Sequence, residues 1–327
     1  MKKEEIFATF KSTETEDWLD YHLMRPLAYR WVKLFERWGT HPNTVTLISI
    51  IIGAVSCIFF AHGSFYYEGW SGVIMNILGF LLLTWAYVFD CTDGQLARLT
   101  GKKSKLGRFL DGAGAYGWYI PIYSALVYRF YCYHTVEFNM LGIANTPTNA
   151  LIATAVVFAL AGVSGIVCLA GQQRLADYYL QVHLFFLKGE KGSELDPAVK
   201  QQQIYDQLPP DAKWWERPVQ KTYISYTRMQ ERKTPQFQRL MSKLYEKYGT
   251  SDQFPAEVRQ RVHGESLKTM KYVFMLVFNF RTIFLYLFCL LDVPVAYFLF
   301  ETIVITLIMQ YVNRRHERFC KQIADEI

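Results

Sequence analysis

The stretch FDCTDGQLARLTGKKSKLGRFLDGAGA (residues 89–115) places a cluster of charges between two apolar runs, at 72–89 and 113–128. Neither run contains a charged residue, and uncharged runs of about this length are typical of membrane-spanning helices. The charged stretch therefore predicts a polar connection between two spanning helices, at one surface of a membrane.

Four further runs of low charge bring the expected number of spans to six: 44–61, 150–171, 270–291 and 293–312. The chain of 327 residues is 51% hydrophobic, and Lys plus Arg exceed Asp plus Glu by 35 − 29 = 6. These averages fit neither a soluble domain nor a wholly buried transporter, but they fit apolar spans that alternate with polar segments. The expected fold is an all-α integral membrane protein with six transmembrane helices.

Residues 16–38 predict an additional amphipathic helix that lies in the plane of the membrane surface. Large apolar side chains recur there near helical spacing, with basic residues between them, which is typical of interfacial helices anchored by tryptophan. The alternative is a soluble helix packed on another domain. The polar start of the chain, MKKEEIFATFKSTETED, predicts no cleavable leader. Six scattered cysteines without a C-x-x-C pair predict neither zinc nor disulfides.

Positive charge is distributed unevenly over the connections between the spans. If the N-terminus lies inside, basic clusters occupy the inner segments, whereas the outer connections 62–70 and 132–149 contain no Lys or Arg. Basic residues favour the cytoplasmic side, so both termini and the 89–115 stretch are expected there. The chain then divides into an N-terminus with its juxtamembrane helix (1–40), spans one to four (41–187), a cytosolic helical insert (188–266), and spans five and six with a tail (267–327).

Three aspartates in the charged stretch are the candidate metal ligands. Asp90 and Asp93 are one helical turn apart and share a helix face, where two carboxylates repel one another unless a cation lies between them. Asp111, at the start of the next span, would supply a carboxylate from a facing helix. Mg²⁺ and Mn²⁺ prefer oxygen ligands of this kind together with phosphate oxygens, and the basic loop between the helices is suited to attracting phosphate.

The spacing of the whole stretch reads D-x2-D-G-x2-A-R-x8-G-x3-D, and seven residues fill it: Asp90, Asp93, Gly94, Ala97, Arg98, Gly107 and Asp111. It resembles the signature of the CDP-alcohol phosphotransferase (CDP-alcohol phosphatidyltransferase) family, integral membrane enzymes of phospholipid biosynthesis. The resemblance covers most of residues 16–187 and 268–320, and the insert between them is unmatched.

The resemblance implies a reaction and a role for each motif residue. The family transfers a phosphoryl-linked group from a CDP-alcohol, usually CDP-diacylglycerol, to an acceptor hydroxyl and releases CMP. By the family pattern, the three aspartates hold a divalent metal, Mg²⁺ or Mn²⁺, and the diphosphate. Gly94 and Ala97 make room for the cytidine, while Arg98 and Gly107 shape its pocket.

The family pattern continues with x3-D, and in this chain that fourth position is Ala115. The resemblance implies that an aspartate there acts as general base on the acceptor hydroxyl and helps to hold a second metal. Three explanations stand: the aspartate was replaced so that substrate is held unreacted, a natural enzyme takes its base from elsewhere, or the chain binds a CDP-lipid without turnover. A general base contributes about 10²–10⁴ in rate, so Ala115 predicts a slow enzyme rather than an unfolded one.

Charged and polar residues outside the motif give weaker signals. Arg281 and Glu301 lie inside expected spans, where a charge indicates either a functional site or a mutual ion pair. Four residues at inner helix ends are candidates to hold the phosphate of a phosphorylated acceptor, together with Arg108 in the loop: Gln172, Gln173, Arg174 and Lys271. Inner basic residues are equally well explained by membrane orientation.

The expected function is metal-dependent transfer from a CDP-alcohol to a polyol, polyol phosphate or amino alcohol. One alternative is a non-catalytic CDP-lipid-binding or scaffold protein, which Ala115 favours. Another is a small transporter, which is disfavoured because transporters bind near the membrane midplane. The expected partners are the CDP-alcohol, the acceptor alcohol, membrane lipids and a second copy in a homodimer, with no nucleic acid.

Overall fold

The computed structural model describes residues 3–102 and 105–327, without the side chains of Lys3, Lys105, Arg108, Asp111 and Ala113. Every element within these two ranges is helical, which confirms the all-α class. Five described stretches are long and apolar enough to cross a membrane: Pro42–Ala61, Trp70–Thr100, Pro147–Lys188, Ala256–Leu290 and Pro294–Glu326. They coincide with five of the expected spans. The sixth, 113–128, falls in α6 (Lys105–Tyr133), which includes undescribed side chains, so a count of six stays a prediction.

The chain forms two compact units, and the first contains residues 1–170 and 278–304. Its helices are α1 (Lys3–Phe7), η1 (Thr13–Thr15), η2 (Asp20–Met24), α2 (Arg25–Arg37), α3 (Pro42–Ala61), α4 (Phe65–Glu68), α5 (Trp70–Thr100), α6, α7 (Thr135–Leu141), α8 (Pro147–Gly162), η3 (Val163–Leu169), α14 (Phe278–Leu290), α15 (Pro294–Leu299) and the start of η7 (Phe300–Ile305). Three of these helices, η2, η3 and η7, are π-helical.

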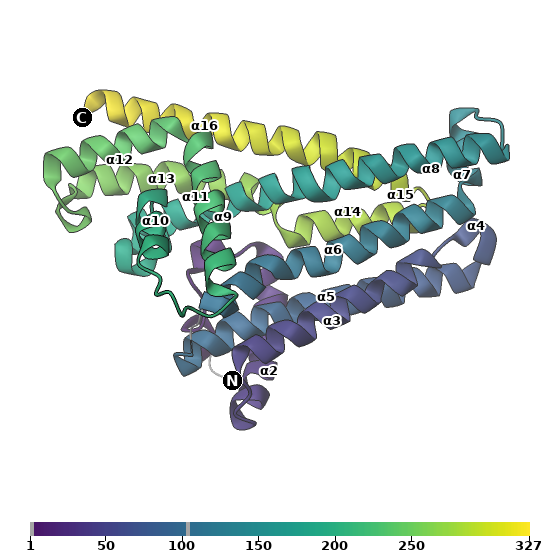
Figure 1. The fold of residues 1–327 in the computed structure, drawn as a ribbon, viewed down its shortest axis with the longest axis horizontal. Coiled ribbons are helices and arrows are strands. Elements are labelled where there is room, and N and C mark those ends of the chain that lie inside the picture. Colours follow the sequence, from purple (N-terminus) through teal and green to yellow (C-terminus); the bar gives the residue numbers. More distant parts are fainter. Residues whose placement is uncertain (1–2, 103–104) are drawn as a thin grey trace. The chain divides into compact units, whose positions relative to one another are not determined.

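Three long helices, α3, α5 and α6, run alongside one another in this unit (Figure 1). Helix α3 begins with Pro42, which needs no backbone donor in a first turn, and His41 Nδ1 accepts the amide of Asn43 at 3.2 Å. Helix α5 ends at Thr100 and is capped by Gly101, whose φ of 69° is the left-handed conformation typical of a residue that terminates a helix. The motif from Asp90 to Arg98 therefore lies on one unbroken helix.

The expected interfacial segment 16–38 becomes η2 and α2, and it divides its apolar residues between two environments. Tyr29, Val32 and Phe35 are buried in a cluster with the C-terminal part of α5, whereas Trp18 and Trp38 are 73% and 65% exposed. The exposed tryptophans fit an interfacial helix, and its location at a membrane surface stays a prediction.

The second unit contains residues 171–277 and 305–327. Its helices are α9 (Ala170–Lys188), η4 (Glu190–Gly192), α10 (Ala198–Asp206), α11 (Glu216–Lys233), α12 (Pro235–Tyr248), η5 (Ser251–Gln253), α13 (Ala256–Val273), η6 (Phe274–Leu276) and α16 (Thr306–Glu326). Helices α12 and α13 both pack on α16. The carboxylate of Glu317 in α16 accepts the amides of Gln236 and Phe237 at 2.6 and 3.3 Å, which satisfies donors at the start of α12.

Candidate active site

Asp93 is the more deeply buried of the two motif carboxylates whose side chains the structure describes. It lies on α5, is 5% exposed, and accepts a hydrogen bond from the hydroxyl of Thr46 on α3. A buried carboxylate with a hydroxyl donor is held in a fixed direction. Thr46 belongs to the PNTVT sequence that opens the first span, and this contact fixes the register of α3 against the motif helix.

Asp90 is half-buried one turn earlier on α5 and faces α6. A Cβ added at Gly114 of α6 would lie 3.7 Å from its Oδ1 atom. Gly114 precedes Ala115, which packs at the edge of a buried cluster that includes Trp118. An aspartate at position 115, as in the family pattern, would therefore directly follow Gly114, the residue of α6 that approaches Asp90.

Two predicted site residues cannot be placed by their side chains. The backbones of Arg108 and Asp111 lie in α6, but their side chains lie outside the described residues. Asp111 is one helical turn before Ala115, so the two positions share a face of α6. The donors that are described fit a hard divalent cation, because Asp90 and Asp93 offer carboxylate oxygens one turn apart. Metal binding by all three aspartates stays a prediction.

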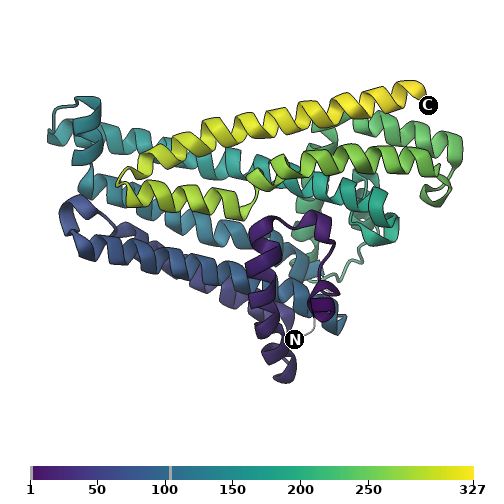
Figure 2. The same ribbon diagram turned by 180° about the vertical axis from the view of Figure 1, so that it is seen from behind.

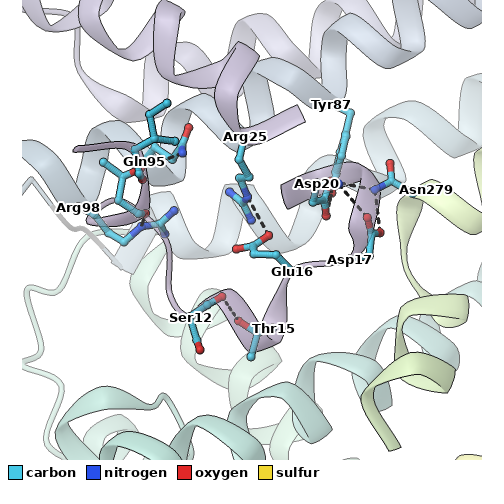
Figure 3. Close-up of polar contacts among 12 residues, drawn as sticks. Ser12, Thr15, Glu16, Asp17, Asp20, Arg25, Tyr87, Gln95, Arg98 and Asn279 are labelled. Carbon is cyan, nitrogen blue, oxygen red and sulfur yellow. Dashed lines mark hydrogen bonds and ion pairs between the residues drawn. The ribbon is translucent and has the colours of Figure 1, made fainter. Parts of the chain in front are cut away.

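Arg98 folds back along α5 toward the N-terminal segment of the chain. A Cβ added at Gly94 would lie 3.4 Å from Nη1 of Arg98, and the Nε atom donates to the carbonyl of Thr9 at 2.5 Å (Figure 3). Gln95 donates to the hydroxyl of Thr9 at 2.9 Å. In Figure 2 this segment, drawn in purple, lies against the C-terminal part of α5. The absence of a side chain at Gly94 thus leaves room for the Arg98 guanidinium as well as for any ligand.

A second polar network joins the N-terminal segment to α5 and α14. Both carboxylate oxygens of Asp20 accept the Tyr87 hydroxyl, at 2.8 and 2.9 Å. Asn279 donates to Asp20 and to Asp17, each at 2.8 Å (Figure 3). Burial, reinforced by the charge of Asp17, raises the pKa of Asp20 to about 6. Tyr87 precedes Asp90 by one turn, so this network braces the motif helix from outside the site.

The raised pKa of Asp20 predicts a pH-dependent contribution to stability. A folded-state pKa above the unfolded value means that the protonated carboxyl stabilises the fold below about pH 4 and that this stabilisation is lost as pH rises to about 6. Asp20→Asn removes the ionisation. At each pH, the melting temperature of the unaltered chain is subtracted from that of the variant. We expect this difference to increase as pH rises from 4 to 6 and to stay constant above pH 7.

The measurement is a set of thermal unfolding curves in detergent at stepped pH. The exposed Asp211→Asn variant serves as the control and should show no such trend. A constant difference between Asp20→Asn and the unaltered chain across the whole range contradicts the assignment.

Arg281 and Glu301 form an ion pair, which decides between the two interpretations that the sequence left open. Both side chains are fully buried, and Glu301 also accepts hydrogen bonds from Ser164 and Tyr123. Ser164 lies in the π-helix η3 and Glu301 in the π-helix η7. Two irregular helical turns thus meet at one buried charge pair.

Four of the five residues proposed for an acceptor phosphate lie in the second unit, whereas Arg108, expected in a loop, lies in helix α6 of the first unit. Gln172 is buried and donates to Thr306 at 3.0 Å, so at least part of its amide serves packing between α9 and α16. Arg174 contributes to a cavity that is described below, and the acceptor role of Gln172, Gln173, Arg174 and Lys271 stays a prediction. Of the contacts that sequence reasoning missed, Thr46 had a local signal, PNTVT, whereas Thr9 and Asn279 had none.

The comparisons with known proteins address the segment that carries this geometry. No curated protein and no solved structure matches the chain. One family model does, and its match begins before α3 and ends in η3, so that it includes the complete motif. The family that this model describes consists of transferases, and the match suggests phospholipid head-group transfer from a CDP-alcohol. The resemblance is thereby confirmed: residues 39–169 match the CDP-alcohol phosphatidyltransferase family.

Proposed function

We propose that this chain transfers a phosphatidyl or related phospho-alcohol group from a CDP-alcohol, with CDP-diacylglycerol as the favoured donor, to a small acceptor alcohol. The acceptor oxygen forms a bond to the phosphorus that carries the alcohol, the bond from that phosphorus to the CMP oxygen breaks, and CMP leaves. The hydroxyl proton passes to a base or to water. The observation that carries the proposal is the family match over a segment in which Asp90 and Asp93 lie on one helix beside α3 and α6.

The residues of the chain divide this work by position. Asp90, Asp93 and Asp111 would hold Mg²⁺ or Mn²⁺, which when bound neutralises charge on the diphosphate and on the departing CMP. Thr46 orients Asp93 through its hydrogen bond. Gly94, Ala97, Arg98, Gly107 and Arg108 would surround the nucleotide. Transfer reactions of this kind depend mainly on positioning and electrostatics.

The site is proposed to face the cytoplasm, since the basic residues of the chain cluster on the same side as the motif. The acceptor would then be a soluble alcohol and the donor a membrane lipid. Asp93 lies toward the end of α5 that contacts the N-terminal segment through Arg98 and Thr9. If the N-terminal segment is cytoplasmic, the motif is expected on the same side.

A second candidate function is binding of a CDP-lipid without turnover. Ala115 favours it, because its methyl group packs at the edge of an apolar cluster and offers no proton acceptor. Release of CMP distinguishes the two functions, while metal-dependent binding of a cytidine diphosphate compound is expected from both.

The test uses the full chain in lipid nanodiscs with CDP-diacylglycerol. We expect nucleotide binding that requires Mg²⁺ or Mn²⁺ and that Asp93→Asn weakens by at least about tenfold, since disturbing even the outer shell of a metal site costs 10–100-fold. Release of CMP should require the same metal.

Asp252→Asn is the matched control, because this aspartate is exposed and lies in the second unit. Binding that survives chelation, or equal binding by Asp93→Asn and the unaltered chain, contradicts the proposal.

A further inference from the structure

A cavity of about 600 Å³ lies within the second unit, between α10, α11 and the beginning of α9. Two hydrogen bonds join α11 to α9: Gln230 donates to the carbonyl of Arg174 at 2.8 Å, and Tyr226 donates to Asp177 at 2.8 Å. Figure 1 shows the three helices together in the green part of the chain. Nine residues line the cavity: Arg174, Gln202, Tyr205, Lys221, Ile224, Ser225, Arg228, Met229 and Arg232.

The charge of this lining is of one sign. Four of the nine residues are cationic and none is acidic. Lys221, Arg228 and Arg232 lie on one face of α11, with Ser225 between them, and Arg174 reaches the cavity from α9. Among the described carboxylates, none forms an ion pair with any of the four. A concave surface lined by one sign of charge concentrates ligands of the opposite sign.

The contacts that the cations do make orient them and leave hydrogen-bond donors available. The guanidinium of Arg174 lies 5.7 Å from the centre of the Tyr226 ring, and Lys221 lies 5.7 Å from that of Tyr205. A ring contact of this kind uses no N–H group. Arg228 donates one hydrogen bond, to Gln202 at 3.0 Å, and a guanidinium has five N–H groups.

We propose that this cavity binds a multiply charged phosphate group, a phosphomonoester or a pyrophosphate. Arginine clusters recognise phosphate oxygens through paired hydrogen bonds, and Ser225 adds a neutral donor. The cavity is large enough for a small polar body beside the phosphate, with Ile224 and Met229 as its apolar part. Its concave form and size favour a small ligand or a lipid headgroup over an extended polymer. The proposal goes beyond the transfer reaction and uses no motif residue.

Two kinds of molecule could supply such a phosphate group: a free phosphorylated compound, or a membrane lipid with a phosphomonoester headgroup. The experiment uses the full chain in nanodiscs and contains EDTA, so that a metal-dependent site does not contribute. In the first arm, inorganic pyrophosphate is titrated calorimetrically into phosphatidylcholine nanodiscs. In the second arm, the fluorescently labelled chain is titrated with vesicles that contain phosphatidic acid, and with phosphatidylserine vesicles of equal surface charge.

The variant Arg228→Gln/Arg232→Gln removes two cations from exposed positions of α11, and its melting temperature should match that of the unaltered chain. Lys233→Gln is the control, because Lys233 is exposed on the same helix but does not line the cavity. We expect the double variant to bind at least about tenfold more weakly and the control to bind within about twofold. If the double variant binds pyrophosphate more weakly in the first arm, the ligand is a free phosphorylated compound. If it is weakened only in binding vesicles that contain phosphatidic acid, the ligand is a lipid headgroup.

Three results overturn the proposal. They are no binding in either arm, equal binding by the double variant and the unaltered chain, and an equal loss in Lys233→Gln, which would indicate a general effect of charge. Because EDTA is present throughout, each of these results leaves the test of the transfer reaction unaffected.

Discussion

Replacing Ala115 with aspartate is expected to raise metal-dependent release of CMP from CDP-diacylglycerol by at least about tenfold, a threshold set below the 10²–10⁴ that a general base contributes. Position 115 follows Gly114, the residue of α6 that approaches Asp90. A carboxylate there would be on the face that Asp111 shares, one turn further along the helix. It would accept the proton of the acceptor hydroxyl as the new bond to phosphorus forms.

The control for this prediction is Ala115→Asn, which adds a side chain of almost the same size without a proton acceptor of comparable basicity. The assay compares initial rates of CMP release by the three chains at equal donor binding. A rise with aspartate alone assigns the base to this position. Equal rates for aspartate and alanine, with binding intact, would show that any base of this chain comes from elsewhere.

Removing Arg281 alone is expected to destabilise the protein by about 3–5 kcal/mol, the usual effect of leaving one member of a buried pair without its partner. Arg281 and Glu301 are both fully buried. In Arg281→Met, the carboxylate of Glu301 would keep its hydroxyl donors, Ser164 and Tyr123, but would lose its counter-charge. A loss of this size lowers the melting temperature by roughly 6–20 °C in a domain of this size.

The double variant Arg281→Met/Glu301→Gln should recover most of that loss, because a neutral amide can accept the same hydroxyls without a buried charge. Arg239→Met is the control, since its ion pair with Asp325 is about half exposed on both sides and such pairs contribute little. Thermal and denaturant unfolding of the four chains measure the effect. If Arg281→Met costs no more than Arg239→Met, the pair is not a stabilising element.

The sequence predicts the helices well because a spanning helix is specified by local composition. The uncharged runs at 44–61 and 72–89 lie within α3 and α5, and the spacing of Asp90 and Asp93 does place them on one helix. Local patterns also identify the motif. They do not identify partners from distant parts of the chain, such as Thr46 for Asp93, because these depend on how α3 packs against α5.

Tertiary packing also decides what the sequence leaves ambiguous. A charge in an apolar run has two interpretations, and only the burial of Arg281 beside Glu301 selects the ion pair. In the segment 16–38, spacing alone cannot tell which apolar residues face protein, so Trp18 and Val32 look alike in sequence and differ in exposure. The expected insert, 188–266, lies wholly within the second unit. Helix α16 also belongs to this unit, because it has a buried face that includes Val312 and Phe319.

The π-helical turns at 163–169 and 300–305 have a consequence for the evolution of this chain. Such a turn holds one residue more than an α-helical turn of similar rise, so deleting that residue from either one would restore a regular α-helix with its two halves close to their present orientation. The side chains within the turn, Ser164 or Glu301 among them, would change direction, while the hydropathy profile stayed almost unchanged. Relatives whose spans differ in length by one residue at these places would therefore be expected to have lost or exchanged the acid and the arginine together.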